Sequence, residues 1–234
     1  MSFRPTFANS GVTRFSIWIT VGVVSVAGIE IPKYEVIAKH DGYEVRQYAP
    51  QIVAEVTMTG EFQDAMNGGF RKLADYIFGN NTKVTGGAAS QSENIEMTAP
   101  VLEREVNSEK IEMTAPVLEQ QSKPDARVVS FVMPSKYTLE TLPRPNIADV
   151  RIVEVPSKHY AVNHFSGTVT DDKAAMKKQE LLDALKRDKL EAVGVPLLAQ
   201  YNPPWTPHPM RRNEVMVEIV LEEVGDAATG KPSK

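Results

Sequence analysis

Three stretches near the start of the chain alternate between apolar and polar residues with a period of two. They lie within residues 34–60 and are separated by Asp41-Gly42 and by Ala49-Pro50. Such alternation is typical of half-buried β-strands, and Asp-Gly between two alternating runs is a hairpin signal. The pattern therefore predicts three strands in this part of the chain.

The period then changes to that of a helix over residues 61–78. The apolar residues fall on one stripe at helical spacing, and Gly79 with Asn80 ends the pattern. The stripe consists of Phe62, Met66, Phe70, Leu73 and Ile77. Gly68 and Gly69 each cost about 1 kcal/mol of helix stability relative to alanine. We therefore expect another surface, either a packed strand or a flat ligand, to approach the backbone there.

The second half of the chain repeats this order of elements. Residues 128–134, VVSFVMP, have the pattern of a buried strand, and residues 150–169 that of two strands around Pro156-Ser157. A helix is expected over residues 171–193, with Thr170 or Asp171 as N-cap and Gly194 as its end. Its inward residues are Leu181, Leu182 and Leu185.

A last strand is expected over residues 213–223, with one apolar face formed by Val215, Val217, Ile219 and Leu221. Each half thus contains strands, one helix and further strands. Two such halves sharing one sheet predict an α+β protein, in which a curved antiparallel sheet or open barrel carries two packed helices.

The sequence IEMTAPVLE occurs twice, at residues 95–103 and 111–119. Alternation in both copies predicts two half-buried strands that end near a proline and form the arms of a hairpin. The simplest interpretation is a local duplication with no chemistry of its own. The alternative is that Met97 and Met113 line a pocket for an apolar or soft-metal ligand.

The N-terminal segment has a different character. Residues 15–28 carry no charge, and this length is short for a membrane span of about 20 residues. The segment suits the apolar region of a signal peptide; an uncleaved membrane anchor or a strand of the folded protein are the alternatives. We expect segment 1–28, one domain at 29–224 and a flexible tail at 225–234. The expected location is exported, periplasmic or membrane-associated, with a cytoplasmic one left open.

The composition narrows the chemistry. The chain has 234 residues, no cysteine and a net charge of −4. The missing cysteines exclude disulfides and thiolate chemistry, and the charge predicts no general attraction to nucleic acid. The chain has no GxSxG, HExxH or P-loop pattern. We therefore expect a binding protein and not an enzyme.

Four blocks of sequence resemble the SOUL haem-binding protein family, and they occur in the family's order within residues 34–223. They are GYEVRQYAP, MTAPV, VSFVMPSKYTLETLPRPN and YNPPWTP followed by RRNEVMVEI. The resemblance implies two pseudo-repeated halves that form a distorted antiparallel β-barrel flanked by two helices. It also implies reversible, non-covalent binding of haem or another tetrapyrrole in a surface cleft beside the first helix. The alternative is an effector-binding module for other hydrophobic small molecules.

The resemblance places the cleft between the outer face of residues 61–78 and residues 201–212. The candidate contacts are Asn67, Phe70, Arg71, Leu73, Ala74, Ile77, Trp205 and His208. His208 is the candidate axial ligand of the iron, with an exposed loop histidine as the alternative. Arg211-Arg212 is either a pair that attracts an acidic group or a surface feature.

Three positions depart from the family's pattern. Gln47 stands where some members have the histidine proposed as iron ligand, and an amide cannot replace imidazole there. Asn67 and Asp75 stand where other members carry basic residues for the propionates, and Asp75 would repel a carboxylate.

Overall fold

The structure is a computed structural model, and it describes residues 29–84, 91–106, 125–203 and 205–221. The strands are β1 (Tyr34–His40), β2 (Tyr43–Tyr48), β3 (Gln51–Thr59), β4 (Asn81–Thr82), β5 (Val101–Glu105), β6 (Ala126–Val132), β7 (Arg144–Pro145), β8 (Val150–Val155), β9 (Lys158–Ser166), β10 (Ala192–Gln200) and β11 (Arg212–Ile219). The helices are α1 (Phe62–Ile77), α2 (Asp171–Asp188) and the 3₁₀ turn η1 (His208–Met210).

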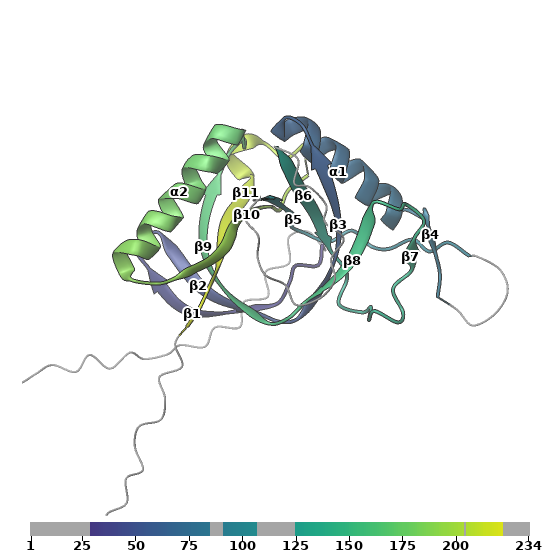
Figure 1. Cartoon of the computed structure of the whole chain (residues 1–234), viewed down its shortest axis with the longest axis horizontal. Helices are drawn as coiled ribbons and strands as arrows, with labels where there is room; N and C mark the ends of the chain where they lie inside the picture. The colour runs from purple at the N-terminus through teal and green to yellow at the C-terminus, as the bar shows by residue number, and fades with distance from the viewer. Residues whose placement is uncertain (1–28, 85–90, 107–124, 204, 222–234) are drawn as a thin grey trace, which may run out of the picture.

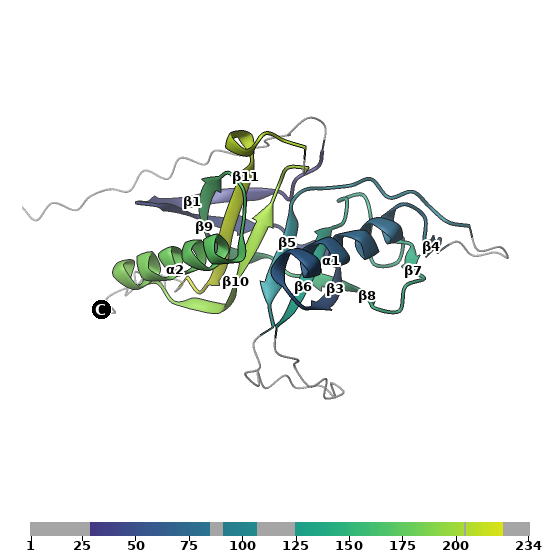
Figure 2. The ribbon, with the colours of Figure 1, turned by 90° about the horizontal axis from the view of Figure 1, so that it is seen from above.

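One antiparallel sheet dominates the molecule. Its nine strands follow the order β1-β2-β9-β11-β10-β5-β6-β3-β8, and β4 and β7 form a separate small pair. Figure 1 shows the sheet curving below the two helices, and Figure 2 shows both helices lying across the same face. The predicted α+β fold of a large antiparallel sheet with two helices is thereby confirmed, while closure of the sheet into a barrel stays a prediction.

Two groups of strands meet in the middle of this sheet, β1-β2-β9-β11-β10 and β5-β6-β3-β8. Helix α1 covers β3 and β6, whereas α2 covers β9, β10 and β11. The pairing of β5 with β10 joins the two groups. The core between helices and sheet is formed by apolar side chains such as Val56, Val129, Leu181, Leu198 and Val217.

The first helix matches its prediction within one residue at each end. A Cβ added at Gly69 would lie 2.7 Å from Cβ of Val129, and one added at Gly68 would lie 2.7 Å from Cε of Met58. Val129 and Met58 belong to β6 and β3, so the strands under the helix account for both glycines. Of the two expected alternatives, the structure shows the packed strand.

The second helix is shorter than predicted. Thr170 is its N-cap, as expected, with Oγ1 accepting a hydrogen bond from the Lys173 amide, but the helix ends at Asp188. Lys189 then takes a left-handed conformation with φ of 59°. The strand β10 that follows was missed because Gly194 and Pro196 interrupt its apolar pattern. Pairing with β11 and β5 on its two sides determines its conformation instead.

The prediction of a strand throughout the first IEMTAPVLE copy is wrong. Strand β5 begins only at Val101, after a cis peptide bond between Ala99 and Pro100. The preceding residues are held by contacts with other segments: the Ile95 amide donates to the Ile77 carbonyl oxygen, and the Ala99 amide donates to that of Glu30. The second copy, at residues 111–119, lies outside the described residues.

The N-terminal segment 1–28 and the tail 225–234 also fall outside the described residues. In the part of the chain that the structure describes, neither helix combines the length and apolar character needed to cross a bilayer.

The last strand, β11, ends at Ile219, and its predicted inward residues Val215, Val217 and Ile219 are buried.

Candidate functional site

The outer face of α1 carries four of the predicted site residues. Asn67 and Arg71 are exposed, and Phe70 and Ala74 are half-buried. The Arg71 Nε atom donates a hydrogen bond to the carbonyl oxygen of Asn67 at 3.2 Å. The Phe70 ring meets that of Phe131 edge to face, with centroids 5.3 Å apart. This face therefore combines an apolar strip with an exposed guanidinium.

Leu73 and Ile77 were expected on the same outer surface, and this expectation is wrong. They are 0% and 1% exposed and belong to the core between α1 and the sheet. The helical period explains the position, because the two residues share the stripe that begins with Phe62 and Met66. They contribute to the stability of the helix and not to an open ligand surface.

Two charged side chains of α1 have partners of their own. Lys72 Nζ lies 2.6 Å from Oδ2 of Asp149, and this hydrogen bond lowers the pKa of the aspartate. Asp75 Oδ2 accepts a hydrogen bond from the Asn80 amide group at 2.7 Å. The negative charge of Asp75 remains on the helix, so Arg71 is the cation of α1 best placed for a ligand carboxylate.

The loop before β11 presents Trp205 and His208. Trp205 is 84% exposed, and His208 begins η1. The His208 Nδ1 atom is hydrogen-bonded to Oγ1 of Thr168, which leaves Nε2 as the nitrogen that could coordinate a metal. This bond ties the loop to the end of β9. For these two residues, no hydrogen bond or ion pair to α1 is present.

A buried charged cluster lies on the sheet face opposite the helices. We call it the Glu214 cluster, and it consists of Arg46, Tyr201, Arg212 and Glu214. Glu214 is 0% exposed and Arg46 is 5% exposed. Arg46 Nη1 lies 3.0 and 3.1 Å from the two carboxylate oxygens of Glu214, Arg212 Nη2 lies 2.7 Å from Oε1, and the Tyr201 hydroxyl donates to Oε2 at 2.7 Å. The carboxylate is thus saturated with charged and polar donors.

These donors determine the protonation of Glu214. Burial alone would raise the pKa of its carboxyl group, but the charges of Arg46 and Arg212 and the hydrogen bonds from Arg212 and Tyr201 outweigh burial and hold it below the ordinary value. Two rings stack on the cations: the Arg46 guanidinium carbon lies 4.4 Å from the Tyr34 ring centre, and that of Arg212 lies 4.1 Å from the Tyr201 ring centre. The cluster is a satisfied network with aromatic walls.

Sequence analysis missed the Glu214 cluster. The sequence left open whether the pair Arg211-Arg212 attracts an acidic group or is a surface feature. Glu214 was predicted only as part of the last strand. The available signal was weak, because Arg46 in YEVRQY and Glu214 in RNEVMVEI each stand beside other polar residues of the same strand. The pattern does not show that these strands lie on either side of β9.

A pocket of about 420 Å³ opens among residues 30–33, 49–52 and 132–140. Its apolar lining includes Ile31, Ile52, Pro134 and Leu139. Its charged lining residues are Glu30, Lys33, Glu140 and Glu154, so carboxylates exceed cations by two. The volume is within the range of about 300–1,000 Å³ typical of small-molecule sites.

This pocket is not the cleft that was expected. Its lining contains no residue of α1 and none from 201–212. It is lined instead by Ala49 and Pro50 of GYEVRQYAP, Thr98 of MTAPV and residues 132–135 and 137–140 of VSFVMPSKYTLE. Gln51 also lines it, and the buried Oε1 atom of Gln51 has no hydrogen-bond partner in the structure. Three of the four blocks that carry the family resemblance therefore meet around one pocket.

Metal chemistry has little support elsewhere in the fold. Within residues 29–84, 91–106, 125–203 and 205–221, no group of three or more histidine or acidic side chains is arranged to hold a metal ion. His40 stacks on Tyr43 and contacts Asp188, and His164 is exposed on β9. A single axial histidine for a haem iron requires no such group.

Solved structures with a similar fold are distant in sequence. The EcmrR–DNA complex in EcmrR-RPo has a TM-score of 0.52 at 9% identity over 76% of this chain and 56% of that chain, so this chain spans little more than half of that relative. The EcmrR C-terminal domain has a TM-score of 0.49 at 11% identity over 76% of this chain and 98% of that one. A hydrolase from Listeria innocua has a TM-score of 0.46 at 13% identity over 78% and 94%. The first of these supports the fold alone.

The sequence comparisons are more specific. None of the curated proteins matches the chain. The model of the family described as "SOUL heme-binding protein" matches residues 29–108 and 103–218, which together cover most of the sequence. With the ordered blocks and a two-helix antiparallel fold, this match shows that the chain belongs to the SOUL heme-binding protein family.

Proposed function

We propose that this protein binds haem or a related tetrapyrrole reversibly and without a covalent link, as a carrier, buffer or sensor. The observation that carries the proposal is the family match over residues 29–108 and 103–218. The proposed role is that of a binding protein, because the matching family is described as heme-binding.

The proposed site is the outer face of α1. Phe70 and Ala74 would contact the ring, and Arg71 would pair with a propionate. The residues present fit such a ligand in part: the apolar strip and the exposed guanidinium are suitable, whereas Asp75 and the half-buried character of Phe70 reduce the contact. A ring held there would be shallowly bound and exchangeable, as a carrier or buffer requires.

The residues 201–212 would complete the site if the loop approaches the ring. Trp205 offers an exposed aromatic face, and His208 offers Nε2 as an axial ligand, with Nδ1 fixed by Thr168. A bound haem would supply the iron and its redox chemistry. Gln47 is not proposed as an iron ligand, since its side chain lies on β2 with its amide nitrogen 3.5 Å from Oγ of Ser157.

The pocket of about 420 Å³ favours a second candidate function, an effector-binding module for other hydrophobic small molecules. The excess of carboxylates around Glu30, Glu140 and Glu154 would repel a dianionic tetrapyrrole. The same charges and the apolar lining suit a neutral or cationic hydrophobic compound. A competition experiment distinguishes the two sites. A compound that binds in this pocket should leave the affinity of hemin for α1 unchanged.

Two substitutions test the proposed site. We expect His208→Ala to abolish the part of the hemin Soret shift that comes from axial coordination, with a small loss of affinity. We expect Arg71→Glu to weaken hemin binding by at least about tenfold, because it replaces a charge-assisted hydrogen bond worth about 1.5–3 kcal/mol with repulsion. The measurement is a hemin titration followed by absorbance.

His164→Ala is the matched control, since it removes another exposed histidine from β9. It should leave both the spectrum and the affinity unchanged. An unchanged spectrum in His208→Ala would exclude His208 as the ligand, and an unchanged affinity in Arg71→Glu would exclude the outer face of α1 as the site.

A further inference from the structure

The slot between β6 and β10 is filled by the first copy of the repeated sequence. Strand β5 pairs with β6 on one side and with β10 on the other. Ile95 is buried, and the hydroxyl of Thr98 donates to the carbonyl oxygen of Val132. Glu103 is buried against Arg127 and Lys178. The first copy therefore supplies a central strand and part of the core.

The equivalence of the two copies extends beyond the nine identical residues. Residues 91–103 read QSENIEMTAPVLE and residues 107–119 read NSEKIEMTAPVLE, so eleven of thirteen positions are the same. Glu93, which accepts a hydrogen bond from the Tyr137 hydroxyl at 2.7 Å, has Glu109 as its counterpart. The one charge difference, Asn94 against Lys110, falls at an exposed position, and no side-chain hydrogen bond of Asn94 is present among the described residues.

We infer that the slot accepts either copy, so that residues 107–121 can replace residues 91–105 between β6 and β10. Each side-chain contact described above is made by a residue that the second copy also contains. The chain thus encodes two strand registers, offset by sixteen residues, with the same partners on both sides. The inference concerns the fold and does not depend on haem binding.

Chain connectivity permits the exchange. With the first copy in place, residues 84–90 and 106–125 form the two connections to the rest of the fold, of 7 and 20 residues. With the second copy in place, the connections would be residues 84–106 and 122–125, of 23 and 4 residues. The entropic cost of closing a loop grows only with the logarithm of its length. The difference in loop lengths therefore changes the equilibrium ratio of the two arrangements by only about twofold.

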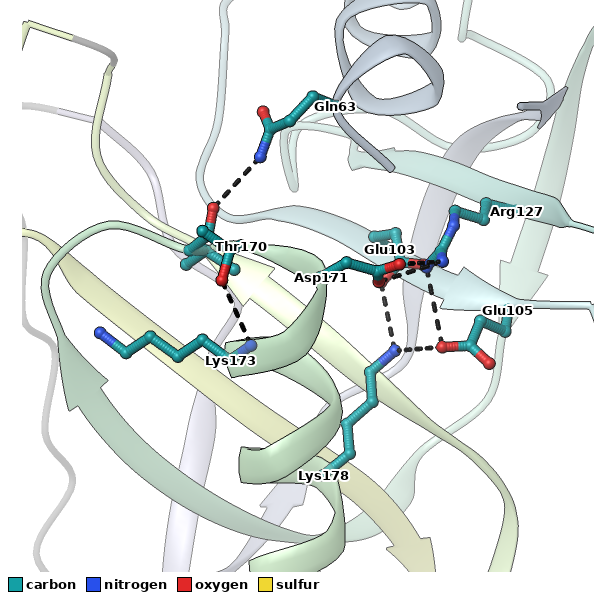
Figure 3. Close-up of polar contacts among 9 residues, drawn as sticks. Gln63, Glu103, Glu105, Arg127, Thr170, Asp171, Lys173 and Lys178 are labelled. Carbon is teal, nitrogen blue, oxygen red and sulfur yellow. Dashed lines mark hydrogen bonds and ion pairs between the residues drawn. The ribbon is translucent and has the colours of Figure 1, made fainter. Parts of the chain in front are cut away.

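The residues that follow each copy favour the first one. Arg104 lies 3.7 Å from Glu55, and Glu105 lies 3.4 Å from Lys178 and 3.7 Å from Arg127. Figure 3 shows Glu105 beside Glu103 at the point where α2 meets β5 and β6. The second copy has Gln120 and Gln121 at these positions, so it would lose these ion pairs. The ion pairs of Arg104 and Glu105 therefore favour the register that the structure shows.

Disulfide trapping tests the exchange directly, because the natural chain has no cysteine. Leu102 and Ser130 are partners across β5 and β6, so Leu102→Cys with Ser130→Cys should cross-link on oxidation. Leu118→Cys with Ser130→Cys reports the second register and should also cross-link. Val117→Cys with Ser130→Cys is the control, since a shift of one residue turns the side chain to the other face of the sheet.

Two further changes should move the ratio of the registers. Arg104→Gln with Glu105→Gln gives the first copy the ending of the second, and we expect a several-fold rise in the yield of the 118–130 cross-link. Gln120→Arg with Gln121→Glu should also raise the yield of the 118–130 cross-link, because it gives the second copy the ion-pairing residues of the first. The cross-links are measured in the otherwise natural sequence and in each of these two double variants. A 118–130 yield no greater than that of the 117–130 control in all three would overturn the inference.

Stability gives an independent readout. Ile95→Asp should leave a cooperatively folding protein, because the second copy then fills the slot, and Ile111→Asp should have little effect. The double variant should lose cooperative thermal unfolding, so the two substitutions should be strongly non-additive. If Ile95→Asp alone behaves like the double variant, the second copy cannot replace the first.

Discussion

Replacing Glu214 by glutamine is expected to lower the free energy of unfolding by about 3–5 kcal/mol, because it removes one partner from a buried ion pair. Arg46 is almost entirely buried, and its Nη1 atom is directed at both oxygens of this carboxylate. The amide of glutamine would leave this buried guanidinium with Glu44, a partly exposed carboxylate 2.9 Å from Nη2, as its remaining acidic partner among the described residues. Urea unfolding at neutral pH, followed by circular dichroism, measures the loss.

Glu218→Gln is the matched control on the same strand. Glu218 pairs with Lys158, but both side chains are about one third exposed, so its loss should cost less than about 1 kcal/mol. Equal stability of the two variants would mean that the Glu214 cluster does not hold β2 and β11 on either side of β9.

The same substitution should change the acid sensitivity of the protein. The pKa of Glu214 in the folded protein lies below its ordinary value of 4.5, so its contribution to stability is complete above that value and is lost as the pH falls through the lowered folded pKa. The wild type should therefore lose stability more steeply below about pH 4.5 than Glu214→Gln does. Parallel curves for both proteins would contradict this assignment.

Replacing Arg127 by methionine is expected to cost about 3 kcal/mol. Arg127 Nη1 lies 3.0 Å from the buried Glu103, and Nη2 lies 3.0 Å from Asp171 at the start of α2. Its guanidinium carbon also lies 5.2 Å from the ring centre of Phe62, at the start of α1 (Figure 3 shows the ion pairs). Among the described residues, removing the guanidinium leaves Lys178 as the cation beside Glu103, and it loosens the junction of both helices with β6.

Arg151→Met provides the comparison for Arg127→Met. Arg151 is more than half exposed and lies 3.9 Å from Glu55, so its replacement should change stability by less than about 1 kcal/mol. Thermal unfolding of the two variants in parallel separates the effects. A melting temperature for Arg127→Met within a degree of that for Arg151→Met would show that the buried cluster is energetically neutral.

Much of the fold follows from local patterns. The strands β1, β2, β3, β6, β8 and β9 and the helix α1 were predictable because alternation or helical spacing continues through them without interruption. Strand β10 was not, because Gly194 and Pro196 break its pattern and its pairing with β11 and β5 decides its conformation. Ile95 and Thr98 alternate like strand residues, yet hydrogen bonds to Ile77 and Val132 hold them in an irregular segment.

The site was less accessible to sequence reasoning than the fold. A family resemblance identified α1, but only the structure shows that Leu73 and Ile77 face the sheet. Glu214 looked like a strand residue, and its pairing with Arg46 across 168 positions leaves no local signal. The pocket draws on five separate segments, so no single motif could indicate it.

Binding of the tetrapyrrole is the central claim, and a titration with hemin followed in the Soret region tests it most directly. Iron-free protoporphyrin IX is titrated in parallel through quenching of tryptophan fluorescence. We predict saturable, one-to-one binding of hemin with an affinity in the submicromolar range, and weaker binding of protoporphyrin IX because it lacks the iron that His208 would coordinate. The absence of saturable binding of either porphyrin would contradict the proposed function.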